Sequence, residues 1–256
     1  MNKTRETKKS DSANSLIFGI RPVLEALETG LPLERVFLVK GSSHDNHRNI
    51  AKLSKKMGVP LKLVPQEKLQ RLTRKNHQGV VAFSSPVAFF HIDSLLPQLF
   101  EDGKNPLLVL LDGVTDVRNF GAIARSAECF GAHAVVIGMD HSAPINGEAV
   151  KSSAGALLNI PICRSSDLVR TIETLKNSGV RCVACSEKAE INYREANFAD
   201  PVCLVMGDEG EGIREAVLER CDDHVGIPMF GKTESLNVSV SAGILLAEMA
   251  QQRNNA

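Results

Sequence analysis

The apolar residues of the chain follow two different patterns, which change near Pro106. In the first part, short apolar runs alternate with amphipathic segments, and Ile20–Gly30 has apolar residues at helical spacing and a glycine at its end. This pattern predicts helices over 20–30, 47–58 and 65–74 and strands over 35–41, 61–64 and 79–85. We therefore expect a small α/β domain over residues 15–86.

After Pro106 the apolar runs become continuous and alternate strictly with helical segments. Continuous runs are expected of strands that are buried on both faces. The predicted strands cover 106–114, 132–139, 161–163, 181–187, 201–207 and 224–229, and the predicted helices cover 119–131, 146–158, 166–179, 213–221 and 235–253. Such repeated strand–helix units predict an α/β domain over residues 106–256, with a parallel sheet and helices on both of its faces.

Two segments lie outside these domains. Residues 87–105 lie between Pro86 and Pro106, contain Pro97 and carry only a weak apolar patch, so we expect a linker there. Residues 1–14 are polar and have no apolar core, which predicts a disordered tail and argues against a secretory signal. No apolar run approaches 18 residues, so we expect no membrane-spanning helix. We predict a cytoplasmic protein whose six cysteines are reduced.

The formal net charge is zero, but the charges are segregated along the chain. Residues 1–105 carry 17 Lys and Arg against 10 Asp and Glu, whereas residues 106–256 carry 13 against 20. One stretch holds nine basic residues and a single acid, Glu67: Arg48, Lys52, Lys55, Lys56, Lys62, Lys68, Arg71, Arg74 and Lys75. A basic module on an acidic body indicates a polyanionic partner, although a solvated helix face would also explain the charges. Aromatic residues are too scarce for a platform that stacks single strands.

Cys182 and Cys185 form a Cys-x-x-Cys pair, a spacing that occurs in redox and zinc sites. The pair lies inside the predicted strand 181–187, where residues three apart point to opposite faces. A redox pair opens a helix, and a structural zinc site needs a second pair of ligands. The sequence has neither feature, so we interpret both residues as buried core cysteines and expect no metal.

The segment Gly207–Gly212 (GDEGEG) follows a predicted strand and precedes a helix, where a dinucleotide loop would lie. Its glycines are not in the order Gly-x-Gly-x-x-Gly, and its three acids, Asp208, Glu209 and Glu211, would repel a pyrophosphate. This argues against a nucleotide-dependent dehydrogenase. A cationic ligand with hydroxyl groups and no phosphate, such as S-adenosylmethionine, suits the acidic loop. A tight turn with solvated acids is the alternative.

Two further loops carry polar residues after predicted strands. Asn119 opens the helix 119–131 and can act as its N-cap. Arg125 lies among small and apolar residues, where a long cation needs a dedicated partner, and its planar fork of donors matches phosphate. Ser235 and Asn237 lie at the mouth of the last helix, which one of them caps. Because ligands bind at the carboxyl ends of strands in open α/β sheets, we expect the three loops to form one site.

These loops also carry a family resemblance. The segments 119–125 (NFGAIAR), 204–213 (LVMGDEGEGI) and 227–248 (IPMFGKTESLNVSVSAGILLAE) resemble motifs one, two and three of the SpoU (TrmH) branch of the SPOUT RNA methyltransferases. Residues 19–27 and 76–82 resemble the ribosomal-protein-like, RNA substrate-binding domain of many members. Within the family, the chain most resembles ribose methylases of a guanosine in large-subunit ribosomal RNA. One departure is Val117 where members often have proline, which removes no functional group.

The resemblance implies a deep trefoil knot in the C-terminal domain and S-adenosylmethionine as cofactor, held by the backbone at Gly207, Ile227 and Leu236. It also implies a homodimer in which both subunits build the pocket. The roles that it implies are activation of the ribose 2′-hydroxyl by Arg125, shaping of the site by Asn119 and Asn237, positioning by Ser235 and ordering of the knot by Glu209. Two other functions stay open: a tRNA ribose methylase, and a catalytically silent RNA-binding or ribosome-assembly protein.

Overall fold

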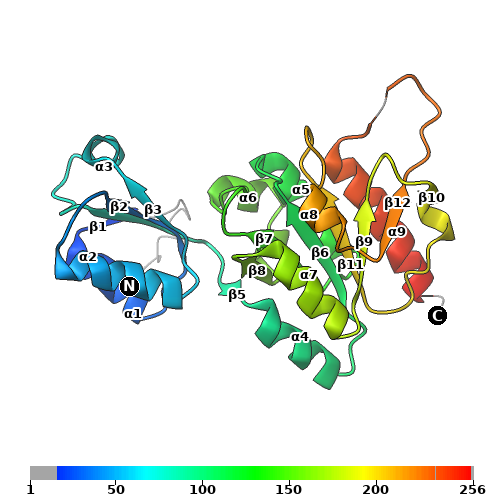
Figure 1. The fold of residues 1–256 in the computed structure, drawn as a ribbon, viewed down its shortest axis with the longest axis horizontal. Helices are drawn as coiled ribbons and strands as arrows, with labels where there is room; N and C mark the ends of the chain where they lie inside the picture. Colours follow the sequence, from blue (N-terminus) through cyan, green and yellow to red (C-terminus); the bar gives the residue numbers. More distant parts are fainter. Residues whose placement is uncertain (1–15, 234, 255–256) are drawn as a thin grey trace, which may run out of the picture.

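The computed structural model describes residues 16–233 and 235–254. The disordered tail predicted for residues 1–14 lies outside the described residues. Figure 1 shows two lobes along the long axis of the molecule: a small lobe formed by the first part of the chain, in blue and cyan, and a large lobe formed by the rest.

The small lobe contains a four-stranded mixed sheet in the order β1-β4-β2-β3. Strand β4 is antiparallel to both β1 and β2, whereas β2 and β3 are parallel. Its elements are β1 (Leu16–Phe18), α1 (Ile20–Glu28), β2 (Leu33–Val39), α2 (Asp45–Lys56), β3 (Leu61–Val64), α3 (Gln66–Leu72) and β4 (Val80–Ser84). All six predicted elements of this lobe form. Only β1 was not predicted, because three residues are too few to show a period.

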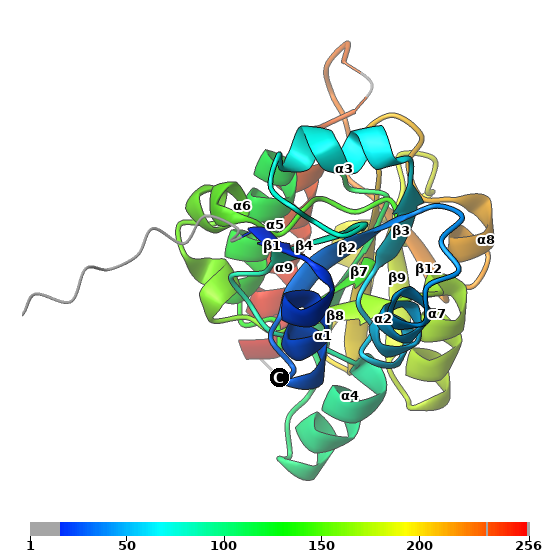
Figure 2. The same ribbon diagram turned by 90° about the vertical axis from the view of Figure 1, so that its left-hand side faces the viewer.

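Helices cover both faces of the small sheet. Val36 and Leu38 of β2 pack with α1 and α2, whereas Phe37 and Val39 pack with α3 on the other face. This arrangement follows from the alternation of side chains along a strand. Figure 2, in which the small lobe faces the viewer, shows α3 above this sheet and α1 and α2 below it. Charged side chains of α2 and α3 therefore belong to different faces of the lobe.

Residues 87–105, predicted as a linker, form two elements of the large lobe. Strand β5 (Phe89–Phe90) pairs in parallel with β8 (Ile162–Ser165) at one edge of the large sheet. Helix α4 (Ile92–Glu101) buries Ile92 and Leu96 against the same sheet and contains Pro97. Proline argued against a helix because it lacks an N–H donor. The burial of apolar side chains offsets that loss here, a tertiary effect that the local sequence does not reveal.

The large lobe contains an eight-stranded sheet in the order β10-β12-β9-β11-β6-β7-β8-β5, and every neighbouring pair is parallel. Its further elements are β6 (Leu107–Asp112), α5 (Val117–Cys129), β7 (Ala134–Gly138), α6 (Gly147–Ser152), α7 (Leu168–Asn177), β9 (Arg181–Cys185), β10 (Ile191–Asn192), β11 (Val202–Gly207), α8 (Glu215–Leu218), β12 (Asp223–Gly226) and α9 (Val238–Asn254). The predicted parallel α/β architecture is confirmed. Strand β11 lies between β6 and β9. The chain therefore enters the middle of the sheet again only after it has passed through β7 and β8 on one side and β9 and β10 on the other.

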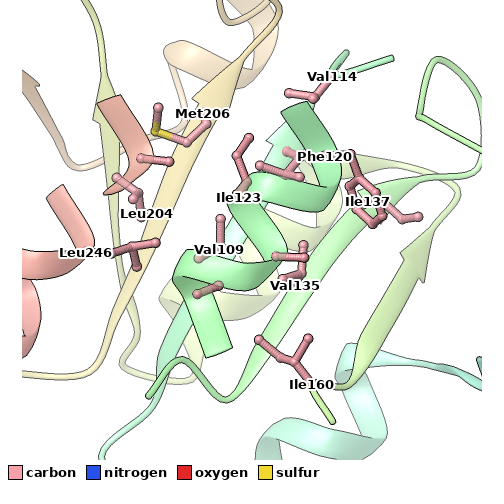
Figure 3. Close-up of a cluster of buried hydrophobic side chains, with 14 of the residues drawn as sticks. Val109, Val114, Phe120, Ile123, Val135, Ile137, Ile160, Leu204, Met206 and Leu246 are labelled. Atoms are coloured by element: carbon pink, nitrogen blue, oxygen red, sulfur yellow. The ribbon is translucent and has the colours of Figure 1, made fainter. Parts of the chain in front are cut away.

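Both faces of the large sheet are buried. Along β6, Val109 and Leu111 belong to the cluster with α5 and α9, whereas Leu108 and Leu110 belong to the cluster with α4 and α7. Figure 3 shows the first cluster, in which Phe120 of α5 lies among the side chains of the sheet. This two-sided burial is the reason why the strands appear as continuous apolar runs in the sequence.

Several predicted elements of the large lobe are shorter than expected; α8, for example, covers only Glu215–Leu218 of the predicted helix 213–221. Helix α6 ends at Ser152, and Ala154 and Gly155 have φ values of 51° and 89°, so the predicted helix 146–158 continues only as a 3₁₀ turn. Strand β12 ends at Gly226, because Pro228 cannot donate to a strand ladder. Since α9 begins only at Val238, the segment between them is a long loop, which projects from the large lobe in Figures 1 and 2.

A buried ion pair joins the two lobes. Arg164 of β8 donates to the carboxylate of Glu34 (2.6 Å) and to the backbone oxygens of Leu33 (2.9 Å) and Glu34 (3.0 Å) in β2. Its guanidinium carbon lies 3.2 Å from the ring centre of Phe89. We refer to Glu34, Phe89 and Arg164 as the joint.

The energetics of the joint favour orientation over stability. The exposed fractions of the Arg164 and Glu34 side chains are 4% and 9%. Burial lowers the pKa of Arg164 to about 10, and burial also raises the pKa of Glu34 even though the two groups are paired. Desolvation therefore outweighs the attraction between the charges. We conclude that the joint adds little net stability but specifies one arrangement of the lobes.

Candidate functional site

A cavity of about 310 Å³ lies at the carboxyl ends of β9, β11 and β12, and we call it the edge pocket. Five residues singled out from the sequence line it: Gly207, Glu209, Ile227, Ser235 and Leu236. They come from two segments, 204–213 and 227–239, that are adjacent in space because β11 and β12 flank β9. The second and third motifs thus meet at one cavity, at the edge where open α/β sheets bind ligands.

The loop after β11 forms one wall of the edge pocket. Asp208 and Gly212 exchange two backbone hydrogen bonds of 3.0 Å. The Asp208 carboxylate accepts hydrogen bonds from the backbone N–H groups of Gly210 (2.8 Å) and Glu211 (3.1 Å), so it holds the turn as well as lining the cavity. A Cβ atom on Gly207 would lie 2.2 Å from the backbone carbon of Gly212. Only glycine therefore allows this close approach of two backbone segments.

The lining of the edge pocket combines an acidic rim with an apolar floor. Glu209 and Glu211 are exposed, and their carboxylates make no hydrogen bond or ion pair with any described residue. We call these two residues the acidic rim. The apolar floor consists of Met206, Ile213 and Leu218. This combination suits a ligand with a cationic group and a flat, apolar group. Within residues 16–233 and 235–254, no cluster of three or more His, Cys, Asp or Glu could hold a metal ion.

Sequence reasoning missed Asp112, at the carboxyl end of β6. Its side chain is 1% exposed, and it accepts hydrogen bonds from Arg214 through the backbone N–H (2.9 Å) and Nε (2.7 Å). The carboxylate also raises the pKa of Arg214. These contacts tie the end of the Gly207–Gly212 loop to the central strand. An acid that ends an otherwise continuous apolar run (LLVLLD) is the signal that could have identified it.

The structure brings the first and third motifs together beside the edge pocket. Asn237 donates a hydrogen bond from Nδ2 to Oδ1 of Asn119 (3.1 Å), and its own Oδ1 accepts from the backbone N–H of Ser239 (2.9 Å). Asn237 therefore caps the start of α9. The prediction that Asn119 caps α5 is wrong, because Asp116 fills that role by accepting from the N–H groups of Arg118 (2.7 Å) and Asn119 (3.2 Å). These N–H donors lower the pKa of Asp116. Neither asparagine lines the cavity.

Arg125 lies apart from the edge pocket. Its guanidinium makes no hydrogen bond or ion pair with any described residue, and it does not line the cavity. It belongs to an exposed stripe of α5 with Arg118 and Cys129, whereas the buried stripe of this helix consists of Phe120, Gly121, Ile123, Ala124 and Ala127. Arg125 was expected to need a dedicated partner because it lies among small and apolar residues in the sequence, but that premise is wrong: those neighbours lie on the other side of the helix, and Arg125 is exposed.

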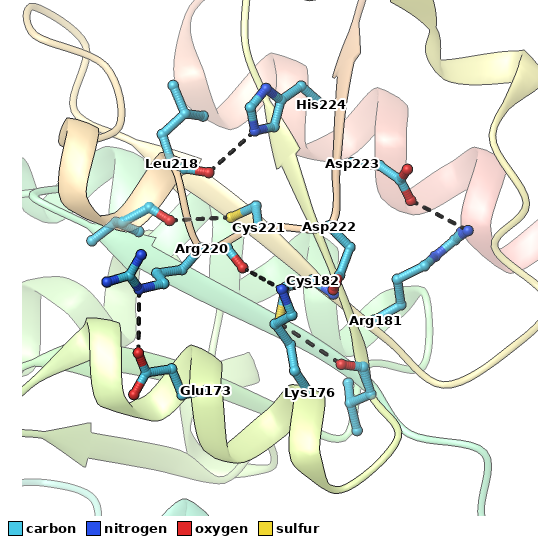
Figure 4. Close-up of polar contacts among 12 residues, drawn as sticks. Glu173, Lys176, Arg181, Cys182, Leu218, Arg220, Cys221, Asp222, Asp223 and His224 are labelled. Carbon is cyan, nitrogen blue, oxygen red and sulfur yellow. Dashed lines mark hydrogen bonds and ion pairs between the residues drawn. The ribbon is translucent and has the colours of Figure 1, made fainter.

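The cysteine pair separates as predicted. Cys182 belongs to the cluster on the α7 side of the sheet, and Cys185 packs against the cluster on the α5 side. Figure 4 shows Cys182 among polar residues of β9 and α7, where its N–H donates to the Asp222 carboxylate (2.8 Å). Cys185 is not a fully buried core residue, because it is half-buried and lines the edge pocket. Burial raises the pKa of its thiol to about 11, so the thiol stays protonated at neutral pH.

Comparisons with known proteins agree on one family. The sequence profile of the SpoU rRNA methylase family matches residues 106–247, and the profile for RNA 2′-O ribose methyltransferase substrate binding matches residues 16–90. The chain is 36% identical over 251 residues to an uncharacterized tRNA/rRNA methyltransferase of Mycolicibacterium vanbaalenii, a match that covers 97% of this chain and 80% of that protein.

Two solved structures resemble the whole chain. The SpoU methyltransferase AviRb from Streptomyces viridochromogenes, in complex with the cofactor AdoMet, is similar with a TM-score of 0.60 and 25% identity, covering 98% of this chain and 95% of that one. The crystal structure of an RNA 2′-O ribose methyltransferase is similar with a TM-score of 0.55 and 28% identity, covering 98% and 93%. None of the described helices is long and apolar enough to cross a membrane.

Proposed function

Because the chain belongs to the SpoU rRNA methylase family and is thus an RNA methyltransferase, we propose that it transfers a methyl group from S-adenosylmethionine to a ribose 2′-hydroxyl of RNA. The substrate is a guanosine of large-subunit ribosomal RNA, and the reaction takes place in the cytoplasm. The observation that carries this proposal is the edge pocket, where the segments 204–213 and 227–239 meet.

The chemistry of the edge pocket suits S-adenosylmethionine. The acidic rim complements the sulfonium and ammonium cations, and the apolar floor suits the adenine ring. The backbone at Gly207, Ile227 and Leu236 holds the adenosine, since all three residues line the cavity. When bound, S-adenosylmethionine supplies an electrophilic methyl group and a neutral sulfide leaving group. We also expect the two segments to be threaded as a trefoil knot, as the family resemblance implies.

The chain's own residues must activate and align the ribose. A 2′-hydroxyl is a weak nucleophile with a pKa far above neutrality, so its developing negative charge needs stabilisation as the proton leaves. Arg125 supplies this stabilisation through its guanidinium, and a phosphate of the target, held by the same guanidinium, accepts the proton. The hydrogen bond between Asn119 and Asn237 fixes α5 against α9, and Ser235 positions the ribose. Glu209 orders the loop at the pocket once the cofactor is bound, through the cation of that ligand, because its carboxylate contacts no described residue.

The exposed position of Arg125 supports a homodimer in which one protomer completes the pocket of the other. Arg125 is outside the edge pocket of its own chain. Helix α9 packs against α5 and buries Val238, Ala242 and Leu245, yet its other side carries the exposed Val240. A helix that is apolar on more than one side normally has a second partner. A second copy seated on α5 and α9 would cover this surface and bring Arg125 to the partner's pocket.

Methyl transfer to defined RNAs tests the reaction and the substrate. Purified protein and radiolabelled S-adenosylmethionine are incubated with protein-free 23S ribosomal RNA and with bulk tRNA, and the modified position is mapped as a 2′-O-methyl block to reverse transcription. We expect label in one guanosine of the ribosomal RNA. Label in tRNA alone would favour the tRNA methylase, and labelling of neither RNA despite RNA binding would favour the silent RNA-binding protein.

Mixed dimers test the role of Arg125. Arg125→Ala should lower kcat by about two to three orders of magnitude and leave cofactor affinity unchanged. Arg125→Lys should also fail, because a point charge does not reproduce the planar fork. If Arg125 acts on the partner's pocket, mixing Arg125→Ala chains with Gly207→Ala chains should restore part of the activity that both lack alone. Without such recovery the shared site is refuted, and a fully active Arg125→Ala enzyme would refute the catalytic role itself.

A further inference from the structure

Eight of the nine basic residues predicted as one module are divided between two surfaces of the small lobe, and the ninth, Lys62, lies on β3. Helices α2 and α3 lie on opposite faces of its sheet, as the two separate clusters of buried side chains show. The α2 surface carries the exposed residues Arg48, Lys52, Lys55 and Lys56. The α3 surface carries Lys68, Arg71, Arg74 and Lys75, on α3 and on the loop that follows it. The sequence alone does not show which set meets a polyanion.

The α3 surface combines cations with aromatic rings. The ammonium of Lys68 lies 5.3 Å from the ring centre of Phe37, and that of Lys75 lies 5.4 Å from the ring centre of Phe18. Phe37 also makes an edge-to-face contact with Phe83, with ring centres 6.0 Å apart. All three rings belong to the α3 side of the sheet and are only partly buried. Among the described residues, no cation lies over a phenylalanine ring on the α2 surface, where the ring contact is between His44 and His47, and Arg48 is already paired with Asp45.

Beside α3 lies a cavity of about 770 Å³, which we call the face pocket. It is lined by Gln66 and Gln70 of α3 and by the loop residues Arg74, Lys75 and Asn76, all of them exposed. Amide groups both donate and accept hydrogen bonds, as the edges of unpaired bases do, and the two cations match phosphate. The lining therefore suits a single-stranded nucleotide.

The loop that forms the face pocket is held rigidly. Gln78 has a φ of 50°, which is uncommon for a residue with a side chain, and its Oε1 accepts a hydrogen bond from the N–H of Ile20 (3.1 Å). The buried His47 contacts the loop through one of its ring nitrogens. Its Nε2 lies 2.8 Å from the backbone oxygen of Gln78, and its Nδ1 lies 2.6 Å from Ser42 Oγ. A Cβ on Gly79 would lie 2.8 Å from His47 and Val39 side-chain atoms. A strained but well-supported loop of this kind is typical of a binding site.

Helix α3, which borders the face pocket, and the loops that border the edge pocket lie toward the same end of the molecule. In Figures 1 and 2, helix α3 lies on the side toward which the loops after β11 and β12 project, whereas α1 and α2 lie on the other side of the small sheet. The joint holds the lobes in this arrangement. An RNA on the α3 surface is thus on the side of the methyl-transfer site, whereas one on the α2 surface is not.

We propose that RNA docks on the α3 surface, with Lys68, Arg71, Arg74 and Lys75 on its phosphates and an unpaired nucleotide in the face pocket. The inference rests on the proposed function and deepens it, because the substrate-binding profile over residues 16–90 does not distinguish the two surfaces. In this arrangement the α2 cations keep the lobe in solution and contribute little to RNA affinity.

Two matched variants test the docking surface. One carries Lys68→Gln, Arg71→Gln, Arg74→Gln and Lys75→Gln, and the other carries Arg48→Gln, Lys52→Gln, Lys55→Gln and Lys56→Gln. Both lose four positive charges from exposed positions of the same lobe. Binding of a fluorescent RNA hairpin with a single-stranded loop is measured at several salt concentrations, with melting temperature as the control for folding. The α3 variant should bind on the order of 100-fold more weakly and lose about 0.7 in salt slope per contact removed. The α2 variant should stay within about threefold of wild type, since its cations touch no phosphate.

A second pair of measurements tests the face pocket. Gln66→Ala with Gln70→Ala should abolish the preference for the looped hairpin over a fully paired duplex, with an unchanged salt slope because no charge is lost. Equal weakening by the two four-residue variants, or a preference that survives in the glutamine variant, would overturn the proposal. These outcomes are separate from methyl transfer: a wild-type enzyme that labels no RNA refutes the proposed function, whereas the binding comparison decides the docking surface in either case.

Discussion

The two lobes use their sheets in different ways. In the large lobe, helices cover both faces of the sheet, and the edge pocket lies where three parallel strands end. In the small lobe, one face of the sheet is only partly covered, and the face pocket lies beside the helix on that face. The first site depends on two backbone segments approaching closely, and the second depends on exposed charges and amides. The edge pocket should therefore be sensitive to one added methyl group, and the α3 surface to charge.

The largest effect is expected at the joint, which connects the two sites. Arg164→Met leaves the Glu34 carboxylate and two backbone oxygens buried without their donor. Removing one partner of a buried ion pair costs about 3–5 kcal/mol of unfolding free energy. Calorimetric melting should show this loss, and methyl transfer to RNA should fall further than binding of cofactor or RNA to the folded protein.

A second substitution sharpens this test. Adding Glu34→Gln to Arg164→Met removes the unpaired carboxylate and should recover part of the melting temperature. No recovery would mean that the two side chains do not act as a pair. Unchanged methyl transfer in the single variant would mean that the sites do not need a fixed arrangement.

A smaller effect is expected at the edge pocket. Gly207→Ala places a Cβ 2.2 Å from the backbone carbon of Gly212, so the loop must move. Overpacking of this kind costs about 3 kcal/mol, which corresponds to a loss of affinity for S-adenosylmethionine on the order of 100-fold. RNA affinity should not change, because the RNA docks on the other lobe. Gly231→Ala is the matched control, since a Cβ there meets nothing within 4 Å. Equal losses in both variants would contradict the assignment, as measured by calorimetric titration.

A still smaller effect is expected where α2 meets the large lobe. Gly58 and Gly30 follow two helices of the small lobe with φ of 62° and 71°, so alanine costs about 1–2 kcal/mol of strain at either position. Only at Gly58 would the new Cβ meet the other lobe, 2.9 Å from the His91 ring. Gly58→Ala should therefore lower kcat/KM for RNA more than Gly30→Ala, with similar melting temperatures. Identical kinetics would show that this contact does not help to align the lobes.

The smallest effect concerns pH and the large lobe. Burial lowers the pKa of His133 from its ordinary value of 6.5, and its Nδ1 accepts a hydrogen bond from the N–H of Leu107 (3.0 Å). His133 is therefore protonated more readily in the unfolded chain than in the folded protein. The neutral imidazole contributes fully to the stability of the folded protein above pH 6.5, and this contribution is lost as the pH falls through the folded-state pKa. His133→Gln, which keeps an acceptor, should flatten the fall in melting temperature between neutral and acidic pH. A curve parallel to that of wild type would exclude this role.

The sequence by itself determined the parallel α/β architecture and indicated two of the segments that line the edge pocket. Continuous apolar runs identified the buried strands, and the order of glycines and acids in residues 207–212 identified an unusual loop after β11. These features are local, since they depend on side-chain period and backbone freedom within a few residues. The family resemblance, rather than any local pattern, singled out Gly207, Ile227 and Leu236, and all three line the edge pocket.

Only the tertiary structure decided the rest. Arg125 is exposed because α5 turns its apolar neighbours toward the sheet, and residues 87–105 are ordered because β5 pairs with a strand more than 70 positions later. Eight of the nine cations form two surfaces because α2 and α3 lie on opposite faces of one sheet. Arg164 and Glu34 are 130 positions apart, and the sequence around either residue gives no indication that the two form an ion pair. Contacts between distant segments depend on how whole elements pack, and this information is spread over the chain rather than contained in any one motif.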